Sequence, residues 1–591
     1  MTSTSVSPVK TEPAEIALNT RDDLRAFGTN ARLLFVAELR LGIDDIEAFA
    51  ADCLTDGNND KKCDLVHVSR DLGRITVAQA VAVSSPSKGP SANKSSDLNT
   101  GVSWLLAGDI NRLPEALKGA AIEARSALED GSIQQFHIWG VHNRPHDANF
   151  ETELAQVKQT AAALIKTHFP KAQVEVMSEQ IGLEALANDY KSIQLPILVT
   201  ETFDFRTLGG YEVSGSSWKA YCTAINATEL RQAWSKHQTR LLSPNIRDYL
   251  GVRRSEQNIN YGIKRSAVNE PGEFMVYNNG ITALVHSFVP DPNGDGSNVI
   301  RVNGLGIVNG GQTTGSLGTL TDAEAGHLDA AWVQVRFVES QSQDIVQNVV
   351  QYNNTQNKVE AADFRSNDAV QARLRTEFQD IPDALYRGGR RGGTLDAIKH
   401  KRNLLPDNTV VQALAAFHGD PNLAYNQTRE IWINDAYYAR LFNENTKAEH
   451  LLLCYSLFKA VEHAKLELAR IPEEERIGSQ KTHMSFFTGR GSIAVMTAAW
   501  GGCIETVLGR VVPNRFDLRF TGSSTPQQAI DNWKPIVSLG LAFAGRLKPA
   551  VDRGLQNKGN VEAAVMSFGE MIEATRSANA AVYDAFAAMV E

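Results

Sequence analysis

Residues 276–285 read VYNNGITALV and residues 306–320 read GIVNGGQTTGSLGTL, and these two stretches decide how the middle of the chain is organised. Each one joins an apolar, strand-like run to a dense group of Asn, Gly, Gln and Thr. Such residues tolerate sharp turns and present neutral hydrogen-bonding groups close to the backbone. A packed core seldom needs that chemistry twice in so short a span, whereas a polar ligand such as a nucleotide does.

The second stretch places its polar residues where a strand is expected to end and a helix to begin. The first turn of a helix has N–H groups without intrahelical partners and the positive end of the helix dipole, which suits a phosphate. We therefore predict a nucleotide- or phosphate-binding site built from both stretches. Its residues are Asn278, Asn279, Gly310, Gly311, Gln312, Thr313 and Thr314.

A third polar group follows the helix predicted for DIVQNVVQYNN, and it contains Asn354, Gln356 and Asn357. Taken alone, such a group is typical of helix capping and turn formation. Together with the other two stretches, we interpret it as a further part of the same site.

Bulk composition sets the class of protein. The 591 residues favour several domains, and the 42% apolar and 21% charged shares are ordinary for globular protein. The net charge of −9 argues against a general nucleic-acid coat.

No apolar run reaches the length of about 18 residues that a membrane span requires. Five scattered cysteines indicate buried thiols in a reducing cytoplasm and not a zinc site, and residues 1–19 are expected to be a disordered lead-in.

Residues 20–205 alternate helices and strands, which predicts a mixed α/β sheet with helices on its faces. The runs DLVHV (64–68) and ITVAQAVAV (75–83) flank a short turn and predict a hairpin. With the turn centred near Leu72, Asp64 should lie beside Gln79 on the adjacent strand.

This order of elements resembles the PD-(D/E)XK nuclease fold, also called restriction-endonuclease-like. The resemblance implies that Glu38 and Asp64 are ligands of Mg²⁺ and that Gln79 completes the catalytic group. Val81 stands where the fold has a lysine that orients the attacking water. Two readings stay open: a metal-dependent nuclease, or a nuclease-like domain that has lost catalysis and binds nucleic acid.

A basic stretch lies between residues 387 and 402, where glycines separate the charges. One interpretation is a solvated loop, and the other is a loop that contacts the phosphates of nucleic acid. Its cations are Arg387, Arg390, Arg391, Lys399, Lys401 and Arg402.

Four motifs within residues 225–410 resemble the AIPR family, which is named for abortive-infection phage resistance. They read NIRDYLG, YNNGIT, VNGGQTTGSL and YNNTQNKVEAADFRSND in chain order. The resemblance implies a central α/β domain, a bacterial or phage-related origin and a role in antiviral defence. Family members typically carry a Gln-Ser-Lys element on the N-terminal hairpin, and here that element reads Gln79-Ala80-Val81. GGQTT (310–314) and NNTQN (353–357) are also similar to the two boxes of ParB-like CTPases, which implies a nucleotide-binding switch.

Residues 411–591 show apolar residues at helical spacing, for example over 447–470, and predict an all-α domain. Such a domain is expected to be an interaction or dimerisation surface. The predicted partners are a second copy of the chain and a phage or defence-operon protein, so a non-catalytic scaffold or sensor is a third reading. Overall we expect an α/β multidomain protein with a nuclease-like first domain, a central AIPR domain and a helical last domain.

Overall fold

The computed structural model describes nearly all of the chain outside the N-terminus and several loops. The described ranges are 13–55, 61–81, 92–194, 197–245, 256–292, 298–342, 368–389, 403–552 and 554–591, with 294, 296, 345–346, 348–350, 353 and 365. Eight predicted site residues lie outside these ranges: Asn354, Gln356, Asn357, Arg390, Arg391, Lys399, Lys401 and Arg402. Within the predicted lead-in, helix α1 (Pro13–Thr20) begins at residue 13. None of the helices in the described ranges is long and apolar enough to cross a bilayer.

The N-terminal domain is built on a four-stranded sheet in the order β1-β2-β3-β4. The strands are β1 (Leu65–Ser69), β2 (Arg74–Val81), β3 (Gln135–His142) and β4 (Glu175–Ile181). The hairpin β1–β2 is antiparallel, whereas β2, β3 and β4 run parallel. Leu65 pairs with Ala78, so the same register places Asp64 beside Gln79, as the sequence predicts.

Helices cover both faces of this sheet, because alternate residues of each strand point to opposite faces. Leu65, Ala78 and Trp139 pack in one core, beneath α3 (Ala31–Leu41), α4 (Ile46–Cys53) and α8 (Leu183–Gln194). The residues adjacent to these on the same strands are Val66, Val77 and Ile138, and they join the opposite core. That face carries α5 (Ala92–Ala107), α6 (Glu115–Glu129) and α7 (Ala148–His168).

The central domain is a β-ring flanked by helices. Among the described strands, pairing runs β5-β6-β10-β7-β9, and β9 pairs back with β5, so the ring closes. The strands are β5 (Val199–Ser214), β6 (Trp218–Asn226), β7 (Ile281–Val285), β9 (Val299–Asn309) and β10 (Trp332–Ser340), with β8 (Ser287–Pro290) continuing β7 along β9. We call this domain the barrel.

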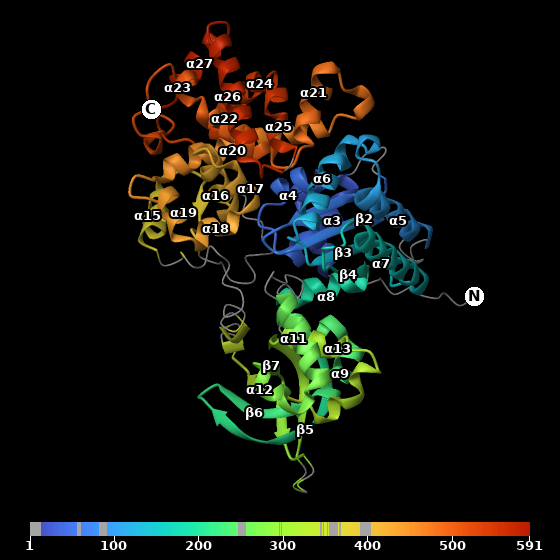
Figure 1. The fold of residues 1–591 in the computed structure, drawn as a ribbon. Helices are drawn as coiled ribbons and strands as arrows, with labels where there is room; N and C mark the ends of the chain where they lie inside the picture. Colours follow the sequence, from blue (N-terminus) through green and yellow to red (C-terminus); the bar gives the residue numbers. More distant parts are fainter. Residues whose placement is uncertain are drawn as a thin grey trace, which may run out of the picture.

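One long strand makes the closure possible. The first half of β5 pairs with β9 and the second half with β6, and the register shifts between Thr207 and Gly210. Gly209 adopts a φ of +85°, a conformation that favours glycine, at this bulge. The helices α9 (Ala227–His237), α11 (Glu256–Asn269) and α13 (Gly311–Gly318) flank the ring (Figure 1).

The C-terminal part of the chain folds around one helical core. Its main helices are α16 (Asp407–Phe417), α17 (Pro421–Asn426), α20 (Ala448–Ala469), α22 (Ser492–Gly502), α24 (Pro526–Leu541) and α26 (Lys558–Thr575). The same core includes Leu374 of α15 (Ala369–Glu377), Tyr386 of β11 (Leu385–Tyr386) and Leu405 of β12 (Leu404–Leu405). Strand β5, which spans the predicted boundary at residue 205, pairs into the barrel, and Leu374, Tyr386 and Leu405 pack with the helices.

The N-terminal domain and the C-terminal helical region pack against each other, while the barrel projects from them (Figure 1). Arg490 precedes α22 and donates to the backbone carbonyls of Asp52 and Val66. The phenol oxygen of Tyr425 lies within hydrogen-bond distance of both Asp52 and Glu123, at 3.0 Å from each carboxyl group. Burial raises the pKa of Glu123 to about 7, whereas Arg490 and Lys465 outweigh burial at Asp52 and lower its pKa. We call Asp52, Glu123, Tyr425, Lys465 and Arg490 the interdomain charge network.

Candidate functional site

The predicted nuclease residues Asp64 and Gln79 lie together at one edge of the N-terminal sheet. The parallel strands end there at Val81, His142 and Ile181, and ligands of open α/β sheets bind outside such carboxyl ends. The Asp64 carboxylate accepts the backbone N–H of Ala80 over 2.6 Å. Gln79 is buried on the neighbouring strand, so the hairpin brings both side chains to the expected place.

Glu38 lies on α3 and is held by Arg21. The guanidinium of Arg21 donates to both carboxylate oxygens of Glu38, over 2.8 and 3.1 Å, and also pairs with Asp23. The two carboxylates offered for Mg²⁺ are thus both engaged in direct contacts, and Val81 supplies no cation. This donor set does not fit a resident Mg²⁺ in the arrangement seen, because Arg21 would first have to leave Glu38.

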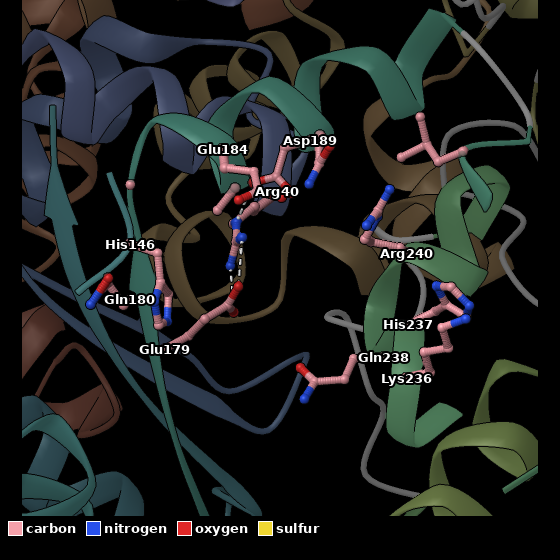
Figure 2. Close-up of a pocket in the computed structure, with 14 residues that line it drawn as sticks. Arg40, His146, Glu179, Gln180, Glu184, Asp189, Lys236, His237, Gln238 and Arg240 are labelled. Atoms are coloured by element: carbon pink, nitrogen blue, oxygen red, sulfur yellow. Dashed lines mark hydrogen bonds and ion pairs between the residues drawn. The ribbon is translucent and has the colours of Figure 1, made fainter. Parts of the chain in front are cut away.

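A charged cleft separates the N-terminal domain from the barrel (Figure 2). One wall comes from β4 and α8, and the other from the end of α9 and the 3₁₀ segment Gln238–Asn245. Arg40 donates to Glu179 over 2.6 and 2.8 Å and to Asp189 over 2.7 Å, and Figure 2 shows the pair with Glu179 as dashed lines. Across the cleft, Lys236 and His237 both contact Glu201.

The electrostatics of the cleft do not favour an anionic ligand. Burial raises the pKa of Asp189 to about 6, although Arg40 opposes it, and burial lowers the pKa of His237. Arg40, Lys236 and His237 already face carboxylates of the protein, and the cleft encloses about 260 Å³, below the roughly 300–1,000 Å³ of typical ligand pockets. We therefore interpret the cleft as a polar contact region between the two domains.

The barrel brings the two motif stretches into direct contact. Asn278 ends the short helix α12 (Phe274–Tyr277), and its side-chain oxygen accepts from the Thr313 hydroxyl over 3.1 Å and from the backbone N–H of Gly280 over 2.9 Å. Gly310 begins α13 with a φ of +91°, and a Cβ there would lie 2.7 Å from the carbonyl oxygen of Gly280. Only glycine allows this close approach.

A cation joins the third polar group to the same place. Arg336 on β10 donates to Thr282 over 3.1 Å and to Asn353 over 3.1 Å. Thr282 pairs across strands with Asn309, the residue before Gly310. The three motifs therefore meet through β7, and we call the side chains and the turn that join them the polar seam. It comprises Asn278, Thr282, Gly310, Thr313, Arg336 and Asn353.

Other predicted residues take different positions. The Thr314 hydroxyl is buried and donates to the Gly310 carbonyl, so it completes its own helix. Asn279 is exposed, Gly311 is buried and Gln312 is half-buried on α13. Arg387 is half-buried, and the N–H groups of Gly388 and Gly389 fix the start of the basic stretch by donating to Asp407.

Arg336 is the functional candidate that the motif search missed. It lies in the strand AWVQVRFVES, where exposed polar residues alternate with buried apolar ones. That alternation predicts which face of the strand Arg336 occupies, but its contact with Thr282 depends on the parallel pairing of β10 with β7.

A three-layer α/β domain, a closed barrel with a polar seam and a helical region together define a multidomain α/β protein. The model of the family described as AIPR protein matches residues 242–476, which include the whole polar seam. Over that part of the sequence the chain is similar to this family. No curated protein and no solved structure shows a significant match to the chain.

Proposed function

We propose that this protein is an antiphage defence protein whose barrel binds a nucleotide at the polar seam. The observation that carries the proposal is the convergence of three distant motifs. Thr313 bonds to Asn278, and Arg336 bonds to both Thr282 and Asn353. Turn formation alone would not require these side chains to meet across separate strands.

The chemistry of the seam suits a phosphate chain. The first turn of α13 offers backbone N–H groups and the positive end of a helix dipole, and Gly310 lets the helix begin directly after β9. Arg336 supplies a positive charge, and guanidinium groups pair well with phosphate oxygens. Tyr277 directly precedes Asn278 and is 60% exposed, so its ring is free to stack on a base.

Calorimetry of the full-length protein with each of the four ribonucleoside triphosphates, with Mg²⁺ present, tests this function. We expect heat from at least one of them, and a tenfold or greater loss of affinity in Arg336→Ala, because a charge-assisted hydrogen bond contributes about 1.5–3 kcal/mol. Arg301→Ala is the control, since Arg301 is an exposed barrel arginine paired with Asp204. Absence of heat with all four nucleotides, or equal affinity in Arg336→Ala, would remove the proposal.

A second function concerns the N-terminal domain, which we propose is restriction-endonuclease-like and binds nucleic acid. The sheet order β1-β2-β3-β4, the preceding helix α3 and the placing of Asp64 beside Ala80 support it. Because Glu38 is paired with Arg21 and Val81 replaces the lysine, we propose that this domain binds without cutting.

Two assays separate binding from cutting. Plasmid DNA and RNA are incubated with the protein and Mg²⁺ or Mn²⁺, and their mobility is followed in the same samples by gel shift. We expect a shift without degradation, and identical integrity of the substrate with wild type and Asp64→Ala. Metal-dependent degradation that disappears in Asp64→Ala would establish a nuclease instead, and absence of any shift would exclude nucleic-acid binding.

A further inference from the structure

Three metal-ligating side chains meet in the C-terminal helical region. His418 caps the end of α16, and His450 and Cys454 lie one turn apart on α20. The Nε2 atoms of His418 and His450 are 2.9 Å apart, and Sγ of Cys454 lies 3.4 Å from Nε2 of His450. The three ligand atoms therefore surround a single point, within 4.8 Å of one another.

The backbone fixes which nitrogen of His450 faces the other two groups. Its Nδ1 lies 2.9 Å from the carbonyl oxygen of Leu518 and donates to it. The lone pair is consequently on Nε2 and points at His418 and Cys454. A carbonyl that holds the far nitrogen is the usual support of a metal-bound histidine. Without a metal, two donors compete for this one lone pair.

We propose that His418, His450 and Cys454 bind Zn²⁺ or a transition metal of similar preference. Tetrahedral zinc would set its nitrogen ligands about 3.3 Å apart and a nitrogen and a sulfur ligand about 3.6 Å apart. The observed separations of 2.9 and 3.4 Å need only small side-chain movements to reach these values. Two imidazoles and a thiolate select Zn²⁺ or Co²⁺ over Mg²⁺, which prefers oxygen ligands.

The cluster is enclosed by the helical region, because His450 is 1% and Cys454 0% exposed. Burial lowers the pKa of both histidines, and Arg515 and Arg440 lower that of His418 further, so these two cations oppose the approach of a dication. Burial raises the pKa of Cys454, so the metal must displace the thiol proton and compensate the charge.

The site would act as a cross-link within the helical region. It joins the end of α16 to α20 and, through Leu518, to residues 515–518, where Phe516 stacks on the His418 ring at 4.0 Å. The described cluster contains three protein ligands, so solvent would supply a fourth. The sequence pattern argued against a zinc site, because His418 lies 32 residues from His450 and the cysteines are scattered.

Cobalt reports directly on the thiolate ligand. Full-length protein is first stripped of metal with a chelator. One sample is titrated with Co²⁺ and followed by absorption. A second sample is dialysed against Zn²⁺, and its bound metal is measured by mass spectrometry. We expect a saturable thiolate-to-cobalt charge-transfer band, retention of stoichiometric zinc, and a higher Tm with zinc. Cys454→Ser should lose the band and the zinc, whereas Cys503→Ser, which alters another buried thiol of the same region, should keep both.

Absence of the band and of retained zinc in the wild type would show that the three groups are only hydrogen-bonded and would overturn the proposal. Equal zinc retention by Cys454→Ser would do the same. Should Cys454→Ser not fold, His418→Gln at the helix end replaces it, and retained zinc and an unchanged cobalt spectrum in that variant would also exclude the site.

Discussion

At the scale of single residues, several charged side chains are buried and paired, although charged residues usually lie on the protein surface. Arg490 is 4% exposed and reaches two backbone carbonyls of the N-terminal domain. Glu123 is equally buried and accepts from Tyr425. Because a buried ion is costly unless paired, each member of the interdomain charge network depends on the others.

Glu123→Gln should change how stability depends on pH. The folded pKa of about 7 lies above the unfolded value of 4.5, so between these limits the folded state holds a proton that the unfolded state has released. Wild type therefore loses stability as pH rises from 4.5 to 7, by about 3 kcal/mol, and the glutamine variant lacks this loss. Urea unfolding across that range measures it. Glu129→Gln, an exposed change on the same helix, should follow wild type, and parallel curves for Glu123→Gln would contradict the prediction.

At the scale of elements, the junction between β9 and α13 sets the polar seam. The strand ends at Asn309, the helix starts at Gly311, and Gly310 makes the turn in a left-handed conformation. Ile281 of β7 and the Gly280 carbonyl press against this turn. The helix can therefore point its first turn at the seam only while residue 310 has no side chain.

Gly310→Ala should destabilise the barrel by about 2–4 kcal/mol, from a strained φ together with overpacking against β7. Thermal unfolding followed by circular dichroism measures this, and nucleotide affinity should fall in parallel. Gly326→Ala is the matched control, because a Cβ there meets nothing within 4 Å. Similar Tm values for the two variants would show that the turn tolerates a side chain.

The sequence predicted the local parts of this structure and missed the distant pairings. The hairpin register that places Asp64 beside Gln79 followed from strand alternation and one turn, and the helix expected at 447–470 is observed at Ala448–Ala469. Asn278 and Thr313 come from two of the predicted motifs and their side chains are in contact, while the ligand site itself stays a prediction. In contrast, closure of the barrel by β5 and the approach of Arg336 depend on pairings between remote strands, which no local pattern encodes.

At the scale of the whole molecule, the first and last parts of the chain share a polar interface while the barrel projects from them (Figure 1). Lys459 of α20 contacts Asp45 before α4, and Thr409 of α16 donates to the same carboxylate over 2.8 Å. The N-terminal domain and the helical region therefore act as one unit in stability.

Arg490→Met should uncouple that unit. Removing one member of a buried ionic network costs about 3–5 kcal/mol, because the remaining charges stay buried without compensation. Differential scanning calorimetry should then show separate transitions for the N-terminal domain and the helical region, with faster proteolysis between them. Arg546→Met changes an exposed arginine of the helical region and should leave the thermogram intact. A single, unshifted transition in Arg490→Met would show that apolar packing alone holds the interface.

The bond from Arg490 to the carbonyl of Asp52 spans 438 residues of chain, and this separation has a consequence for biosynthesis. A ribosome adds about 5–20 residues per second, so Asp52 leaves the exit tunnel roughly 20–90 s before its cationic partner has been made. During that interval the first domain must persist with its acidic surface in water, while the barrel emerges and closes. Final docking is thus the last event of maturation, and a chain truncated before residue 490 would present an uncovered acidic face to cellular proteases.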